Sequence, residues 1–297
     1  MKLTNNNLKE LCKIAIMAAK EAGQIINEFV DKNVTVNNKE GADSLASQVV
    51  TEVDIKAQEI ILKILEDTIQ NFDLALLTEE SVDDKSRLEK DYFWCIDPMD
   101  GTLAFTEQKP GYAVSIALVS KSGEPNIGVV FDPLTNTLYY AIKGLGAYKN
   151  EKKWNPNLSF NNSNSFSFYV DRSYMQHKNF QIVVSEITSY AKSIGKDKFR
   201  IIENAGAVLN ACWVLENAPA CYFKFPKPEV GGGSLWDFAA TTCIFNETHA
   251  YVSDFNPDPL ALNQAETTFM NKKGVLFASD REIAKRILDL NLQLNMK

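Results

Sequence analysis

The feature that most restricts how this chain folds is an apolar strand that runs directly into two carboxylates. Tyr92-Phe93-Trp94-Cys95-Ile96 is apolar and aromatic, which is typical of a buried strand. Asp97-Pro98-Met99-Asp100-Gly101-Thr102 follows it. Pro98 keeps Asp97 out of helical geometry, and Gly101-Thr102 can open a helix with unpaired N–H groups. Carboxylates bind hard cations and helix N-termini bind anions, so the segment predicts a site for a metal-bridged phosphate.

The charge of the whole chain limits its partners. The 297 residues carry a net charge of −7, which argues against a nucleic-acid polymer as partner because such proteins carry basic surfaces. If an acidic protein binds a phosphate group, a cation is needed between the protein's carboxylates and the phosphate. The length allows one large domain or two.

Cysteine and histidine usage argues against zinc and against a secreted fold. The five cysteines show no C-x-x-C spacing, and the two histidines, His177 and His249, are far apart. Most cysteines have apolar or helical surroundings, which favours reduced thiols and a cytoplasmic location. The first apolar region, Leu11 to Val30, contains several charged residues, so we expect no membrane span, and no signal peptide is apparent.

Hydrophobic periodicity predicts layers of sheet and helix, α+β in the first half and α/β in the second. The Asn- and Ser-rich stretch Asn155–Ser165 predicts a boundary. We therefore expect an N-terminal domain, 1–155, with most of the metal ligands, and a C-terminal domain, 156–297, with Asp237 and substrate contacts. The predicted helices are Leu8–Phe29, Thr51–Ile69, Phe180–Ile194, Ala205–Glu216, Trp236–Asn246 and one at the C-terminus; the strands are Leu74–Leu77, Tyr92–Ile96, Ala113–Ser120, Ile127–Phe131, Thr137–Ala141, Phe166–Val170, Phe199–Ile202, Ala220–Phe225 and Gly274–Ala278.

Three other acidic groups each have a plain structural explanation. Asp54 follows Thr51 by three, so Thr51 could cap a helix with Asp54 in its first turn. Glu79-Glu80 could be a solvated turn, and Asp237 could charge the start of its helix. Such roles do not explain two carboxylates flanked by Pro and Gly-Thr in the Asp97 segment. The spacing there excludes an EF-hand, and the chain has no P-loop or G-x-S-x-G sequence.

Taken in order, four motifs resemble the inositol monophosphatase superfamily of magnesium-dependent phosphatases, which includes inositol monophosphatases and CysQ-like 3′(2′),5′-bisphosphate nucleotidases. An acidic pair, then D-P-x-D-G-T, then W-D opening a later helix, is the pattern of that family, with V-T-x-x-D upstream. Together the four are specific, whereas any one alone is weak. In this chain they are Val50-Thr51-Glu52-Val53-Asp54, Leu77-Thr78-Glu79-Glu80-Ser81, Asp97-Pro98-Met99-Asp100-Gly101-Thr102 and Leu235-Trp236-Asp237-Phe238.

The resemblance implies a layered α-β-α-β-α sandwich and a role for each matched residue. Glu79, Asp97 and the Met99 carbonyl would bind one metal ion, and Asp97, Asp100 and Asp237 a second. Glu79 would also reach a third ion through water and take part in catalysis, while Asp54 and Thr102 would activate the attacking water. Gly101 and Thr102 would present N–H groups to the phosphate. The residues themselves do not indicate an oligomeric state; a homodimer is common in the family and is carried over only from the resemblance.

The residue types at these positions are also consistent with Mg²⁺ as the metal cofactor. Converging carboxylates repel one another, and divalent cations remove this cost. Oxygen-only ligands favour Mg²⁺ over Zn²⁺, and paired ions can stabilise an in-line displacement. We therefore expect two to three Mg²⁺ ions and hydrolysis of a small phosphorylated metabolite by metal-activated water.

The sequence does not choose between several possible substrates. Leu103-Ala104-Phe105 matches neither the inositol phosphatases nor the nucleotidases. Candidate substrate contacts are Gly206, Ala207 and Glu229. The glycine-rich turn after Glu229 either bends that side chain into place or is only a mobile turn. The expected substrate is an inositol monophosphate-like polyol phosphate or adenosine 3′,5′-bisphosphate. The alternatives are a fructose-1,6-bisphosphatase-like enzyme, with Lys224 and Lys227 for the second phosphate, and a catalytically weak phosphate-binding regulatory protein.

Overall fold

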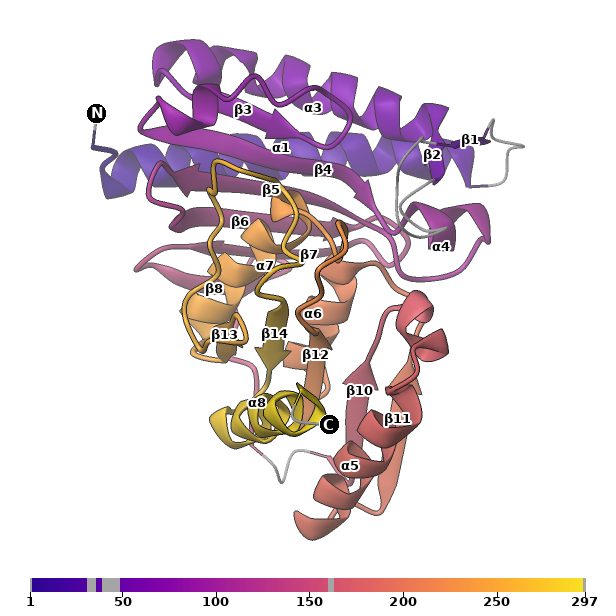
Figure 1. Ribbon diagram of the computed structural model, residues 1–297. Coiled ribbons are helices and arrows are strands. Elements are labelled where there is room, and N and C mark those ends of the chain that lie inside the picture. The colour runs from indigo at the N-terminus through magenta and orange to yellow at the C-terminus, as the bar shows by residue number, and fades with distance from the viewer. Residues whose placement is uncertain (1, 31–35, 39–48, 160–162, 296–297) are drawn as a thin grey trace.

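Helical layers and sheets alternate through the molecule in the computed structural model, which describes residues 2–30, 36–38, 49–159 and 163–295 (Figure 1). Two helices cover the outer face of a seven-stranded sheet, two lie between that sheet and a five-stranded one, and two cover the far face of the second sheet. This confirms the predicted α-β-α-β-α sandwich. The three helix pairs are α1 (Asn5–Phe29) with α3 (Glu52–Asn71), α6 (Ala207–Glu216) with α7 (Leu235–Thr248), and α5 (Phe180–Ser193) with α8 (Arg281–Asn295).

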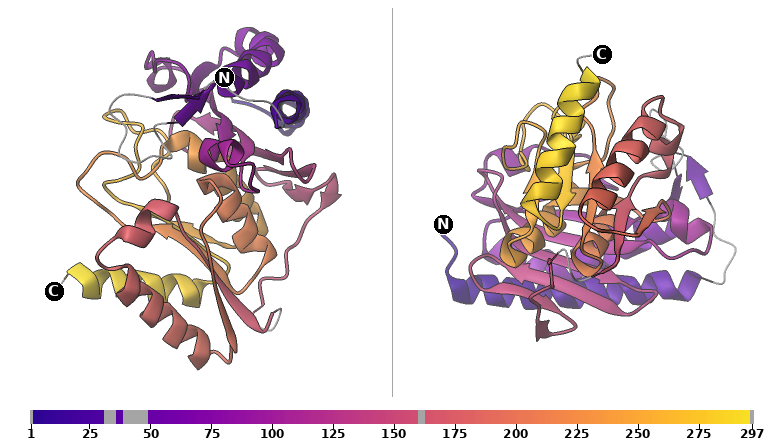
Figure 2. Two further views of the ribbon diagram at one scale, coloured as in Figure 1. Left: turned by 90° about the vertical axis from the view of Figure 1, so that its right-hand side faces the viewer. Right: turned by 90° about the horizontal axis from the view of Figure 1, so that it is seen from below.

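The two large sheets differ in topology, and β1 (Val36–Asn38) and β2 (Val49–Thr51) form a separate antiparallel pair. In the first, β3 to β9 follow in sequence order, with β3 parallel to β4 and the later neighbours antiparallel. In the second, β10 lies between β11 and β12 and is parallel to both. Figure 2 shows α5 and α8 side by side beneath this sheet. The strands are β3 (Ala75–Thr78), β4 (Tyr92–Asp100), β5 (Ala113–Ser120), β6 (Pro125–Asp132), β7 (Thr137–Ile142), β8 (Gly146–Lys149), β9 (Lys152–Lys153), β10 (Ser165–Tyr169), β11 (Lys198–Ile202), β12 (Ala220–Lys224), β13 (Tyr251–Ser253) and β14 (Val275–Ala278).

Strand β4 is apolar at successive positions because both of its faces are covered. Trp94 and Ile96 pack in the cluster formed with α1 and α3. Phe93 and Cys95 belong to the cluster formed with α6 and α7. Side chains alternate between the faces of a strand, so the next odd-numbered residue, Asp97, points toward α6 and α7.

A bulge extends β4 beyond the predicted end at Ile96. Asp97 pairs with Ser115 and Asp100 with Ala113, so one extra residue is accommodated on β4. In a regular strand, positions three apart face opposite sides. The extra residue places both aspartates on the α7 side. The prediction that the strand ends before the carboxylates was therefore wrong, because pairing with β5 continues past Pro98.

The other predicted elements are confirmed to within a few residues, while the strands β1, β2, β8, β9 and β13 had not been predicted. All five cysteines are buried and free, as expected for reduced core residues. Among the described residues, no helix is both long and apolar enough to cross a membrane.

The core between the sheets contains residues from both halves of the chain, and the two-domain division stays a prediction. The short helical elements are η1 (Ser86–Leu88), α4 (Thr102–Thr106) and η3 (Arg172–Gln176).

Candidate active site

The parallel pairing of β3 with β4 brings Glu79 beside Asp97. Thr78 is the register partner of Ile96, and the Glu79 N–H extends the pairing by donating to the Ile96 carbonyl at 3.1 Å. Asp97 is 2% exposed. Its Oδ1 accepts the Met99 N–H at 3.0 Å, which fixes the carboxylate at the bulge.

Asp100 lies against the N-terminus of α6. Its Oδ1 accepts the Ala207 N–H at 3.1 Å and its Oδ2 accepts the Val208 N–H at 2.8 Å. These donors are unpaired within a helix, and the helix dipole favours an anion at this end. Gly206 allows the close approach, because a Cβ at this position would lie 2.3 Å from Asp100 Oδ2.

Asp237 occupies the first turn of α7 and forms a capping box with Ser234. The Ser234 N–H donates to Asp237 Oδ2 at 2.9 Å. The structural role considered for this residue is therefore present. Asp237 also meets the two aspartates of β4: Asp97, Asp100 and Asp237 each offer a carboxylate oxygen, and these oxygens lie within 4.8 Å of one another. We call these three residues the aspartate cluster.

The aspartate cluster is electrostatically strained without a cation. Burial raises the pKa of Asp97 well above its usual value, and the neighbouring carboxylates of Glu79, Asp100 and Asp237 raise it further. Burial, followed by the charge of Asp237, does the same to the pKa of Asp100. The pKa of Asp237 is raised by burial, although the positive charge of Lys224 opposes the rise. A divalent cation would relieve this repulsion.

Helix α3 holds a second carboxylate against the start of α4. Asp54 is 1% exposed, and its Oδ1 accepts a hydrogen bond from the Thr102 hydroxyl at 3.1 Å. One turn along α3, the Gln58 side chain accepts from the Thr78 hydroxyl and donates to the Ser81 hydroxyl at 3.1 Å. The same helix therefore positions Asp54 and the turn that carries Glu79. The Thr51 side chain lies outside the described residues, so its proposed capping role stays a prediction.

The residues predicted to contact phosphate lie between these two acidic groups. Gly101 adopts a left-handed conformation, with φ of 87°, immediately before the first residue of α4. The Thr102 hydroxyl also lies 3.2 Å from the Met99 carbonyl oxygen, so this predicted metal ligand faces the Asp54–Thr102 pair.

A half-buried lysine that the sequence analysis connected only with a second phosphate lies beside the cluster. Lys224 ends β12, its side chain is 17% exposed, and its Nζ lies 2.7 Å from Asp171 Oδ2. The Tyr222 hydroxyl donates to the other oxygen of Asp171 at 2.9 Å. The Lys224 ammonium also interacts electrostatically with Asp237 and Asp100. No local pattern indicates this arrangement, because it depends on the parallel register of β10 and β12.

Glu229 is not part of the aspartate cluster. It is exposed on a bend before three glycines that all have positive φ. Gly233, the last of them, has φ of 87° and brings the backbone close to Asp237, since a Cβ there would lie 2.7 Å from Asp237 Oδ2. The glycine-rich turn thus shapes the approach to α7, and a substrate role for Glu229 stays a prediction.

The residues present fit a hard divalent cation. The clustered donors are all carboxylate oxygens, which suit Mg²⁺, and each oxygen that accepts an N–H keeps a further lone pair. The Asp54–Thr102 pair lies next to the same bulge and can accept a proton. Together the groups can hold cations, orient an anion and deprotonate a water molecule.

Comparison with known proteins gives a family match over nearly the whole chain. The model of the inositol monophosphatase family matches residues 7–292. A 3′(2′),5′-bisphosphate nucleotidase CysQ from Aggregatibacter actinomycetemcomitans is 27% identical over 279 residues, covering 92% of this chain and 93% of the relative. The Nus factor SuhB of Pasteurella multocida is 28% identical over 249 residues, covering 84% and 86%. The structure of the Thermotoga maritima IMPase TM1415 superposes with a TM-score of 0.71 at 22% identity, covering 95% and 97% of the two chains. These matches support a phosphatase and leave its substrate open.

Proposed function

The chain belongs to the inositol monophosphatase family, and from this premise we propose that it is a Mg²⁺-dependent phosphomonoesterase acting on a small phosphorylated metabolite. The observation that carries the proposal is the convergence of Asp97, Asp100 and Asp237, whose carboxylate oxygens lie within 4.8 Å of one another. Although Asp100 and Asp237 also accept hydrogen bonds from backbone N–H groups, the three carboxylates repel one another, and a cation bound among them would remove that repulsion.

In the proposed mechanism, the cations would be held by Glu79, Asp97, Asp100, Asp237 and the Met99 carbonyl. When bound, Mg²⁺ would offset the charge of the carboxylates and of the phosphate and would make the attacking water more acidic.

Asp54 and Thr102 form the proposed proton-accepting pair. Because the Thr102 hydroxyl donates to Asp54 Oδ1 at 3.1 Å, its oxygen is free to accept a proton from the attacking water while its own proton passes to Asp54. The N–H groups of Gly101 and Thr102 would orient the phosphate.

Among phosphomonoesters, the charges around the site favour a substrate with a second anionic group. The Lys224 ammonium, paired with Asp171 at 2.7 Å, lies beside the aspartate cluster and is the cation that we propose contacts this second group. The CysQ relative is named for bisphosphate hydrolysis, which agrees with this preference. We therefore place adenosine 3′,5′-bisphosphate before inositol 1-phosphate and fructose 1,6-bisphosphate.

A regulatory role without turnover is the second candidate function. It is favoured by the relative from Pasteurella multocida, which is named a Nus factor. A binding protein needs the metal ligands but not a proton-accepting pair, and the buried Asp54–Thr102 hydrogen bond therefore weighs toward the enzyme.

Phosphate release from the three substrates, measured side by side with and without Mg²⁺, tests the proposal. We expect Mg²⁺-dependent release, fastest with adenosine 3′,5′-bisphosphate. If none of these esters is hydrolysed at saturating Mg²⁺ while Mn²⁺ still binds, the enzyme proposal fails and the binding protein replaces it.

A further inference from the structure

A buried arginine outside the aspartate cluster links two segments that lead to it. The side chain of Arg87, in η1, has 0% exposure. Its Nε and Nη2 donate to Asp83 Oδ2 at 3.1 and 2.8 Å. Its Nη1 donates to Asn263 Oδ1 at 2.6 Å and to the Gln264 carbonyl at 3.0 Å. Burying a guanidinium away from water is costly unless hydrogen-bond partners surround it, so these contacts fix the position of the Arg87 side chain.

On one side, Arg87 fixes the segment that leaves the Glu79 turn. Asp83 lies four residues after Glu79. Burial alone would raise the pKa of Asp83, but hydrogen bonds from Arg87 and Lys85 outweigh it and lower that pKa to about 2. The Asp83 carboxylate is therefore charged at neutral pH, and both hydrogen bonds that it accepts from Arg87 are charge-assisted. Gln58 binds the other end of the turn that carries Glu79, so hydrogen bonds hold this turn on both sides.

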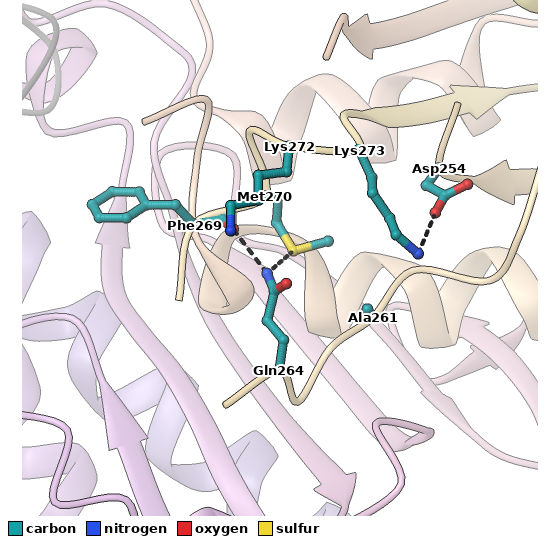
Figure 3. Close-up of a pocket in the computed structure, with 7 residues that line it drawn as sticks. All are labelled: Asp254, Ala261, Gln264, Phe269, Met270, Lys272 and Lys273. Carbon is teal, nitrogen blue, oxygen red and sulfur yellow. Dashed lines mark hydrogen bonds and ion pairs between the residues drawn. The ribbon is translucent and has the colours of Figure 1, made fainter. Parts of the chain in front are cut away.

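On the other side, Arg87 fixes the segment that supports the start of α7. Asn263 returns the contact by donating from Nδ2 to the Arg87 carbonyl at 3.0 Å. The Gln264 side chain then donates to the Phe269 carbonyl at 2.8 Å, as Figure 3 shows. Phe269 forms a β-bridge with Ser234, whose N–H binds Asp237 Oδ2. A continuous set of contacts thus runs from Arg87 to Asp237.

We propose that Arg87 is a positioning residue of the metal site, which holds the Glu79 turn at a fixed distance from Asp237. The inference rests on the proposed function, because it gives Arg87 a role only if Glu79 and Asp237 bind metal together. We assign no ligand to the pocket in Figure 3, because its volume of about 10 Å³ accommodates roughly one water molecule. Arg87 influences the positions of Glu79 and Asp237 through the protein segments that lie between them.

The test uses two variants of the full chain and a direct measurement of metal binding. Asn263→Ala removes both hydrogen bonds between Asn263 and Arg87 and weakens the link to α7, while the Arg87–Gln264 and Arg87–Asp83 contacts stay in place. Arg87→Lys keeps the charge and removes the planar fork. We expect each to raise the Mn²⁺ dissociation constant, measured by electron paramagnetic resonance of free Mn²⁺, about tenfold, at the lower end of the effect of outer-shell partners. At limiting Mg²⁺, phosphate release should fall together with metal binding, because Arg87 acts through the positions of the metal ligands.

Two controls separate positioning from general stability. Arg286→Met removes another arginine link between segments, from Nη2 to Glu186 Oε2 at 2.6 Å, which joins α8 to α5 away from the site. Leu290→Ala creates a cavity in α8 and lowers stability without touching the link. Both should leave the Mn²⁺ dissociation constant unchanged.

The inference is overturned if Asn263→Ala and Arg87→Lys bind Mn²⁺ like the wild type, or if Leu290→Ala weakens binding equally. In that event wild-type phosphate release still supports the proposed function. A wild type that binds no Mn²⁺ refutes both.

Discussion

Replacing Gly206 by alanine places one methyl group between Asp100 and the start of α6. The new Cβ would lie 2.3 Å from Asp100 Oδ2 and 2.6 Å from Oδ1. Carbon and oxygen atoms in close contact are separated by roughly 3.3–3.6 Å, so the carboxylate has to move by about 1 Å. That movement weakens its hydrogen bonds from the N–H groups of Ala207, at 3.1 Å, and Val208, at 2.8 Å.

The displacement should affect both activity and stability. A misplacement of about 1 Å can lower a rate about 100-fold, which corresponds to about 2.7 kcal/mol in the activation free energy. A hydrogen bond to a charged group contributes about 1.5–3 kcal/mol, so we expect a similar loss in the free energy of unfolding. Phosphate release and urea unfolding of Gly206→Ala measure the two effects.

A double-mutant cycle shows whether the added methyl acts through Asp100. In an Asp100→Ala background the carboxylate is absent, and Gly206→Ala should cost little free energy of unfolding. If the cost is the same in both backgrounds, the methyl group disturbs α6 by some other contact and the reasoning is refuted.

Three further variants test other parts of the site. Asp54→Asn should lower kcat about 10²–10⁴-fold with an unchanged Mn²⁺ dissociation constant, since a general base contributes about that much; unchanged phosphate release would remove Asp54 from the mechanism. Lys224→Met should raise the KM for adenosine 3′,5′-bisphosphate about tenfold relative to adenosine 3′-monophosphate, and an equal change for both would exclude recognition of the second phosphate. Asp83 has a pKa lowered to about 2, so its charge stabilises the fold above its unfolded pKa and this contribution is lost as the pH falls through about 2. The stability difference between wild type and Asp83→Asn, from urea unfolding, should therefore be constant above about pH 4 and shrink below it; a pH-independent difference would contradict the Arg87–Asp83 pairing.

Local patterns in the sequence were sufficient to predict the elements that carry the site. The strand around Trp94 was visible because burial on both faces leaves no polar position, and α7 was visible from its apolar run. The Ser234-x-x-Asp237 spacing also contained a capping box, which sequence reasoning could have identified from Ser and Asp three residues apart.

The relations between elements could not be predicted in the same way. The β-bulge after Asp97 depends on pairing with β5, a strand that is distant in the sequence. The Val208 N–H became a partner of Asp100 only because Gly206 allows α6 to approach. Sequence patterns predicted Glu229 as a substrate contact and did not connect Lys224 with the metal ligands, whereas in the structure the charge of Lys224 acts on Asp237. This relation depends on the register of β10 and β12, which local sequence patterns do not specify.

The aspartate cluster is organised by the backbone before any cation arrives. Asp97 is held by the Met99 N–H, Asp100 by the start of α6, and Asp237 by the Ser234 N–H. Backbone donors orient each carboxylate without neutralising it, so the repulsion among the three remains in the metal-free fold. A cation that binds there meets ligands already in place, and less side-chain ordering has to accompany binding. The same positions that cost stability without metal therefore become the source of metal affinity.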